Sequence, residues 1–174
     1  MMALTKLNLR ISGRPVMTLL DADNEFDMDQ PYQRGLVWGE DRKRALIESL
    51  LDGTPIPAII MNNRWAGGFK EDGYSAERLT AFAIIDGKQR VTAIQNFVAD
   101  KFTVPSDWFD TSDVKETAHG KEDIVWSDLT VAAQRGIKMY PIPVAEGSID
   151  SLEGEKRIFD RVNFGGVAQG DTDL

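Results

Sequence analysis

Residues 81–98 constrain the fold of this chain more than any other segment, because they join an apolar run to an amphipathic pattern through a glycine turn. Residues 81–85 are all apolar, and residues 86–90 read Asp-Gly-Lys-Gln-Arg. Apolar side chains then recur at helical spacing at Val91, Ile94, Phe97 and Val98. The pattern predicts a strand, a turn and a helix. The free N–H groups at the start of such a helix suit an anion such as phosphate.

The rest of the chain mixes strand and helix patterns irregularly. Residues 40–51 repeat apolar side chains at helical spacing before Gly53, which predicts a helix, and residues 58–61 form a short apolar run typical of a buried strand. We also expect strands at 16–20 and 137–144, a loop or hairpin tip at 62–77, an exposed excursion at 103–125, and helices at 127–136 and 150–163. This order predicts an α+β fold with a small mixed sheet flanked by helices.

Length and charge limit the possible partners. The 174 residues, 42% of them hydrophobic, fit one domain spanning 1–174. A net charge of −8 argues against a broad basic DNA-binding face, so we expect any DNA contact to be local, transient or made through a partner. The start of the chain is too short and polar for a signal peptide, and no apolar run is long enough to cross a membrane. We therefore expect a cytoplasmic protein without a membrane partner.

The absence of cysteine narrows the chemistry further. Disulfides, thiolate zinc sites and cysteine nucleophiles are excluded, and the single histidine, His119, cannot form a histidine cluster alone. A metal would have to lie on carboxylates, which favours a hard cation such as Mg²⁺ that shares oxygen ligands with substrate phosphates. We expect Mg²⁺ as the cofactor.

Three polar segments stand where secondary-structure elements begin or end, and packing alone does not require their side chains. Each segment by itself is equally consistent with a cap or a plain turn. Together we expect them to converge on one pocket within about 10 Å. Their candidate site residues are Gln33 and Arg34 in the first segment, Asp86, Gly87, Lys88, Gln89 and Arg90 in the second, and Arg161, Asn163, Gly165 and Gly166 in the third.

The residue types in these segments suit a polyphosphate. The basic side chains can neutralise its charge, the glycines let the backbone approach it, and the amides can orient oxygens or water. Asp86 is the carboxylate positioned to hold Mg²⁺ or to accept a proton. We expect Asp86, Gln89 and Arg90 to be catalytic and the other eight residues to bind the nucleotide.

Several motifs, taken in order, resemble a known family. The matching segments are Tyr32-Gln33-Arg34, Trp38, residues 46–51, Pro55-Ile56-Pro57, residues 85–90 and residues 158–166. They resemble the DGQQR-motif family, the N-terminal domain of GmrSD-type, modification-dependent restriction systems in the ParB/sulfiredoxin-like superfamily. The resemblance covers roughly residues 26–168, and the ordered set is specific although each motif alone is weak.

The resemblance implies a ParB/sulfiredoxin-like fold and nucleotide hydrolysis at the DGQQR turn, coupled to sensing or cutting modified or foreign DNA. This sequence has Lys88 where the motif has its first glutamine. Larger relatives continue into a helical region and an HNH-type nuclease domain, which would be a separate effector partner here. One histidine and no cysteine exclude an HNH site and sulfiredoxin activity in this chain.

Three functions stay open at this point. The first is an NTPase or phosphotransferase in DNA processing, in a bacterial defence system or a phage, with a nucleoside triphosphate as substrate. The second is a metal-dependent, ParB-like nuclease, because Asp86-Gly87-Lys88 matches the acid-x-lysine half of a common nuclease site. The third is a non-catalytic module that binds nucleotide as a switch and, in response, binds DNA or a partner.

Overall fold

A mixed sheet forms the centre of the protein. The computed structural model describes residues 7–20, 26–33, 37–66, 68–70 and 82–165. The five strands lie in the order β1-β7-β3-β4-β2, with the pairs β1/β7 and β3/β4 antiparallel and the pairs β7/β3 and β4/β2 parallel. Their bounds are Arg10–Pro15 (β1), Phe26–Asp27 (β2), Ile59–Asn63 (β3), Phe82–Asp86 (β4) and Pro141–Gly147 (β7).

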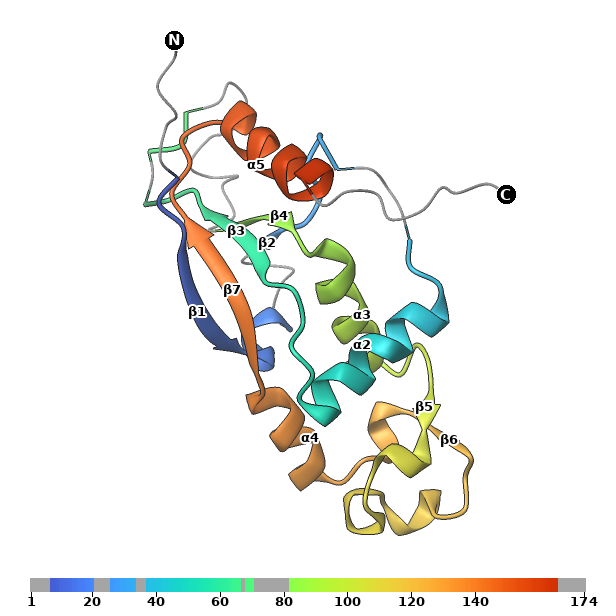
Figure 1. Ribbon diagram of the computed structural model, residues 1–174. Coiled ribbons are helices and arrows are strands. Elements are labelled where there is room, and N and C mark those ends of the chain that lie inside the picture. Colours follow the sequence, from blue (N-terminus) through green and yellow to red (C-terminus); the bar gives the residue numbers. More distant parts are fainter. Residues whose placement is uncertain (1–6, 21–25, 34–36, 67, 71–81, 166–174) are drawn as a thin grey trace, which may run out of the picture.

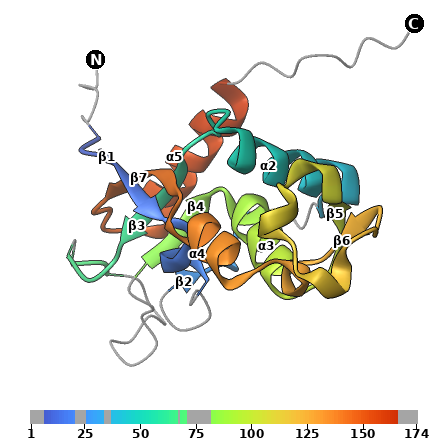
Figure 2. The same cartoon turned by 90° about the horizontal axis from the view of Figure 1, so that it is seen from below.

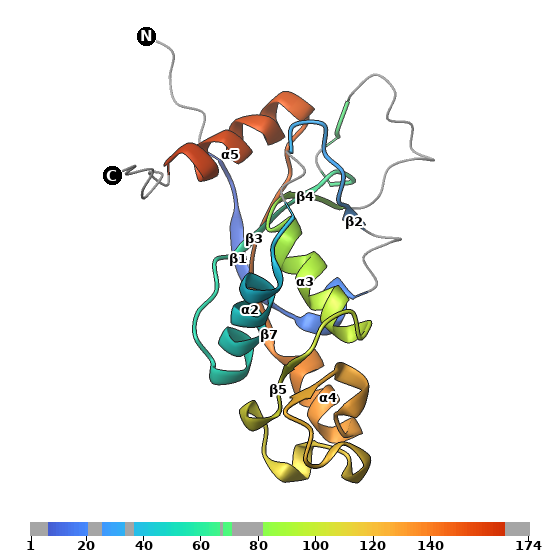
Figure 3. The ribbon, with the colours of Figure 1, turned by 90° about the vertical axis from the view of Figure 1, so that its right-hand side faces the viewer.

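Helices surround this sheet. Their bounds are Glu40–Asp52 (α2), Lys88–Val98 (α3), Val131–Met139 (α4) and Leu152–Gly165 (α5). Figure 2 shows α2 and α3 side by side, and α5 packs against β4. In Figures 1 and 3, α5 lies across one end of the structure and α4 lies at the other. The predicted α+β fold is confirmed, whereas the finer ParB/sulfiredoxin-like assignment stays a prediction.

The apolar patterns of two strands explain their central position. Ala83, Ile84 and Ile85 of β4 are fully buried, and so are Ile59 and Met61 of β3. A strand with apolar residues on both faces is stable only when both faces are covered, which suits the interior positions of β3 and β4 in the sheet. The polar sequence of β1 instead suits its position at the sheet edge.

Two predicted strands need correction. Residues 16–20 are not a strand: Val16–Leu19 form a 3₁₀ helix, because Val16 and Leu19, three residues apart, must both face the core. The strand predicted at 137–144 begins later, at Pro141, since α4 continues to Met139. The α4 helix starts after Thr130, whose hydroxyl accepts a hydrogen bond from the N–H of Ala133 at 3.3 Å.

The segment predicted as an exposed excursion, residues 103–125, is a packed substructure. The short strands β5 (Val104–Pro105) and β6 (Asp123–Ile124) pair in it, and 3₁₀ helices cover Ser106–Trp108, Thr111–Asp113 and Glu116–Ala118. Val104 and Ile124 are fully buried in the main hydrophobic core. The buried residues of this segment are irregularly spaced in the sequence, because short turns place them in the core and no long helix or strand does so.

The helices do not have the character of membrane spans. In the part of the chain that the structure describes, none combines the length and the apolar composition that crossing a bilayer requires.

A buried ion pair joins β3 to α5. The guanidinium of Arg64, just after β3, donates to both carboxylate oxygens of Glu155, at 2.8 and 2.7 Å, and both side chains are fully buried. Arg64 also donates to Asp27 at 2.7 Å and to Gln30 at 2.7 Å. A bidentate arrangement with further hydrogen bonds is what a buried charge pair needs to offset its desolvation.

Two more polar side chains complete this network. Asn62 donates to Glu155 at 2.7 Å and to the carbonyl of Ile149 at 2.8 Å. The hydroxyl of Tyr32 donates to Glu155 at 3.1 Å. Burial, and then the neighbouring Glu155 carboxylate, raise the pKa of Tyr32 above its ordinary value, so its hydroxyl stays protonated as the donor. The network therefore ties segments near residues 30, 63 and 155 together.

We predict that Glu155→Gln lowers the free energy of unfolding by about 3 kcal/mol, because buried Arg64 loses its fully buried carboxylate partner and keeps only the partly exposed Asp27. Urea denaturation followed by circular dichroism measures the change. Glu153→Gln, an exposed acid on the same helix, is the control and should change stability by less than about 0.5 kcal/mol. Equal stability of the two variants would contradict the role of the pair.

Candidate functional site

A pocket of about 390 Å³ opens where β4 passes into α3. It is lined by residues 86–90, by Gln33, Trp38 and Arg42, and by Phe159 and Asn163. In Figure 1 this junction lies beneath α5, with the start of α2 nearby. Segments that are far apart in sequence thus line one cavity, of a size within the range of small-molecule sites.

Gly87 makes the sharp turn between β4 and α3. Its φ is +102°, a left-handed conformation that residues with a side chain rarely adopt. A Cβ at this position would also lie 3.1 Å from the side chain of Ile59 and 3.1 Å from the guanidinium of Arg90. Both the backbone angle and the lack of space therefore favour glycine. The turn at Gly87 places the first residues of α3 at the wall of the pocket.

The start of α3 carries a local positive potential. Among the described residues no side chain caps the helix, and its first turn has no acidic residue. The first N–H groups of any α-helix lack partners within the helix, and they make its N-terminus partly positive. This end of α3 therefore suits an anion in the pocket.

Asp86 and Arg90 form an ion pair across the turn. Arg90 Nη2 donates to Asp86 Oδ2 at 2.6 Å and to the carbonyl of Ala58 at 3.2 Å. The Nε of Arg90 is buried and has no hydrogen-bond partner within the described part of the chain. Arg90 is thus held by the residue before β3 and by the end of β4, and its charge is paired with that of Asp86.

Lys88 is paired as well. Its ammonium donates to Asp29 Oδ1 at 2.5 Å, and the carboxylate of Asp29 is 90% exposed. Because the pair lies at the surface, water screens it and it contributes little to stability. Lys88 can exchange Asp29 for another anion at low cost.

The two glutamines hold the walls of the pocket in place. Gln33 Nε2 donates to the carbonyls of Ile84 and Ile85 at 2.6 and 2.9 Å. Gln89 Oε1 accepts from the N–H of Trp38 at 3.2 Å. Both amides therefore bind backbone here, whereas the sequence suggested that they orient substrate oxygens or water. The buried Oε1 of Gln33 has no partner among the described residues.

Three lining residues were not assigned a role from the sequence. The guanidinium carbon of Arg42 lies 4.7 Å from the centre of the Trp38 ring, and the Phe159 ring lies 5.5 Å from that of Tyr32. Trp38 and Phe159 stand in segments that resemble the family motifs, which was the signal available for them, whereas only proximity to the polar turn in space marks Arg42. Aromatic walls beside a polar turn suit a ligand with an apolar or π surface.

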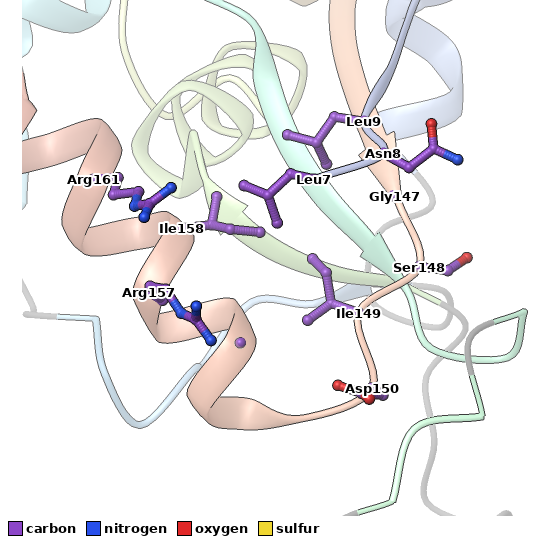
Figure 4. A pocket seen from close by; sticks show the side chains of 11 residues that line it. Leu7, Asn8, Leu9, Gly147, Ser148, Ile149, Asp150, Arg157, Ile158 and Arg161 are labelled. Carbon is purple, nitrogen blue, oxygen red and sulfur yellow. The ribbon is translucent and has the colours of Figure 1, made fainter. Parts of the chain in front are cut away.

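The third predicted segment is only partly at this pocket. Asn163 lines it and donates to the carbonyl of Phe159 at 2.9 Å, and Gly165 ends α5. Arg161 was expected to line the same pocket, but it does not. Its side chain points from another side of α5 into a separate pocket with Arg157 and Ile158 (Figure 4). Two residues apart on a helix, Arg161 and Asn163 face about 200° apart, which explains the difference.

Arg34 and Gly166 lie outside the described residues. Their predicted roles in phosphate binding stay predictions.

The residues of the pocket fit a magnesium ion only when other ligands contribute. Asp86 is the one carboxylate among the described residues that line it, and Arg90 occupies its Oδ2. The described parts of the chain contain no group of three acidic or histidine side chains suited to a metal. Mg²⁺ commonly takes one or two carboxylates together with water and phosphate oxygens. Asp86 Oδ1 can serve in such a set.

Fold and site define the class of this protein: an α+β domain whose glycine turn, at the end of a buried strand, faces a polar pocket suited to an anion. A family model described as GmrSD restriction endonuclease, N-terminal domain, matches residues 16–174. The chain belongs to this family of restriction-system domains, and the resemblance seen in its motifs is confirmed. No curated protein and no solved structure matches the chain.

We predict that Gly87→Ala lowers stability more than Gly53→Ala. Both glycines have positive φ, +102° and +79°, so alanine is strained at either position by about 1 to 2 kcal/mol. Only at Gly87 would the new Cβ also meet Ile59, whereas nothing lies within 4 Å at Gly53. Chemical denaturation of both variants measures the difference, and an equal loss would show that space at Gly87 is not limiting.

Proposed function

We propose that this domain binds a nucleoside triphosphate at the β4–α3 turn and hydrolyses it or transfers its phosphoryl group. The observation that carries the proposal is the uncapped, acid-free start of α3, which opens into a cavity lined by Gly87, Lys88 and Arg90. A helix N-terminus with nearby cations is a general solution for phosphate binding. The aromatic walls at Trp38 and Phe159 suit the base or sugar of a nucleotide.

In this proposal the residues of the turn have separate tasks. Gly87 lets the backbone approach the phosphates, and Lys88 and Arg90 neutralise their charge. Gln33 and Gln89 position the walls, and Asn163 contributes an amide from α5. Asp86 orients Arg90 and, through its remaining oxygen, binds Mg²⁺ or accepts the proton of the attacking group.

The role in DNA processing rests on family membership. A restriction-system domain that binds nucleotide would couple nucleotide turnover to sensing or cutting modified or foreign DNA, through a separate nuclease partner. The net charge of −8 supports DNA contact that is local, transient or mediated by that partner.

The two other functions receive less support. A metal-dependent nuclease needs several carboxylates around its metal, and the described lining of this pocket offers Asp86 alone. A non-catalytic nucleotide switch fits the same pocket, so turnover is what separates it from an NTPase.

We predict that thermal-shift screening with Mg²⁺ finds a nucleoside triphosphate that raises the melting temperature. A ligand at 100 times its Kd stabilises the native state by about 2.7 kcal/mol, which is a shift of roughly 5 to 10 °C for a chain of this size. The matching nucleoside without phosphates is the control and should shift it far less. No shift with any ribo- or deoxyribonucleoside triphosphate would refute the proposal.

We predict that Asp86→Asn keeps nucleotide affinity within a few-fold but lowers turnover by about 10²-fold or more, because the amide can still accept from Arg90 but cannot take a proton. Release of inorganic phosphate and calorimetric Kd values measure the two effects.

The matched control for this variant is Asp160→Asn. Asp160 also pairs with a cation four residues away, Lys156, at 2.7 Å, on α5 and outside the pocket. It should leave both quantities unchanged. Wild-type turnover in Asp86→Asn would move the chemistry elsewhere, and nucleotide binding without turnover in the wild type would favour the switch.

A further inference from the structure

The cations of the pocket differ in how far their charge is already compensated. Arg90 is paired with Asp86 at 2.6 Å and Lys88 with Asp29 at 2.5 Å. Arg42 is the third cation that lines the cavity. Within the described residues no carboxylate lies within ion-pair distance of it.

Arg42 instead stacks on an aromatic ring. Its guanidinium carbon lies 4.7 Å from the centre of the Trp38 ring. A cation–π contact does not depend on hydrogen bonds from the five N–H donors of the guanidinium, and none of the described residues accepts one from Arg42. A guanidinium held in this way is oriented but still able to donate two parallel hydrogen bonds to a phosphate or carboxylate.

The surroundings of Trp38 hold this platform in place. The backbone N–H of Trp38 donates to Gln89 Oε1 at 3.2 Å. This hydrogen bond connects the segment that precedes α2 to the first turn of α3. Arg42 lies one turn further, on α2. The hydrogen bond therefore sets Trp38, and through it Arg42, beside the uncapped start of α3.

We propose that Arg42 is the principal side chain through which this pocket binds the phosphates of its ligand, with Trp38 as the positioning residue. The proposal rests on the proposed nucleotide function and assigns its main charge to a residue outside the 86–90 turn. Lys88 and Arg90 must each give up or share a carboxylate before they bind an anion, whereas Arg42 need not. The ligand class is an organic or inorganic polyphosphate.

Calorimetric titration with Mg²⁺ and inorganic tripolyphosphate tests the assignment without depending on the preferred base. We expect Arg42→Ala to weaken binding by about 10-fold to 100-fold, as for a lost charge-assisted hydrogen bond. The affinity of Arg42→Lys should lie between those of the wild type and Arg42→Ala, because lysine keeps the positive charge but lacks the planar pair of donors. Arg157→Ala, an exposed arginine that lines the other pocket, should change affinity less than about twofold.

The positioning role of Trp38 has its own readout. Binding should change the fluorescence of the wild type, and this change should disappear in Trp38→Phe, in which the other three tryptophans remain. Phenylalanine stacks more weakly with a cation, so affinity should fall only a few-fold. The same fluorescence change in Trp38→Phe would exclude Trp38 from the platform.

The possible failures are distinguishable. If the wild type binds neither tripolyphosphate nor any nucleoside triphosphate, the proposed function is wrong and this inference with it. If the wild type binds and folded Arg42→Ala binds within twofold of it, the proposed function survives and only the assignment of Arg42 is wrong.

Discussion

The buried pair between Arg64 and Glu155 is the constraint on which the site depends. It fixes α5 against the end of β3, and through Asp27 and Tyr32 it also holds the segment that leads to Gln33. Residues from this segment and from α5 both line the pocket. Burying charges costs free energy that apolar residues would not, so the pair is better understood as fixing one arrangement of segments than as adding stability. The arrangement of these segments determines the shape of the pocket.

A second principle is that the polar groups around the turn bind one another before they bind a ligand. Gln33 holds the end of β4, Gln89 holds Trp38, and Asp86 holds Arg90. Side chains fixed in this way lose little conformational entropy when a ligand arrives, which favours affinity. The same pairing lowers the charge that each group can offer. Among the described residues, the donors outside these pairs are the start of α3 and Arg42, and the proposed anion binding depends on them.

Much of this could be predicted from local patterns. Helix α2, strand β4 and the turn into α3 follow from apolar spacing and from Gly87, because their signals are contained in a few neighbouring residues. Residues 16–20 and 103–125 were misjudged, since a 3₁₀ helix and short packed turns have no strong period. The roles of Asn62, Arg64 and Glu155 could not be foreseen, because the partners lie about 90 residues apart along the chain. Arg42 was not named as a lining residue because it lies far along the chain from the 86–90 turn, with which it lines the pocket.

The charge distribution explains how an acidic chain can offer a site for an anion. With a net charge of −8, the protein as a whole repels a polyphosphate, but at physiological ionic strength this repulsion is screened beyond about 8 Å. Within that distance the partial charge of the α3 N-terminus and the guanidinium of Arg42, which has no carboxylate partner among the described residues, would act directly on an anion in the proposed site. A long DNA duplex, in contrast, would extend beyond the pocket and meet the net negative charge of the protein. Local attraction therefore favours a compact anion over extended nucleic acid at this site.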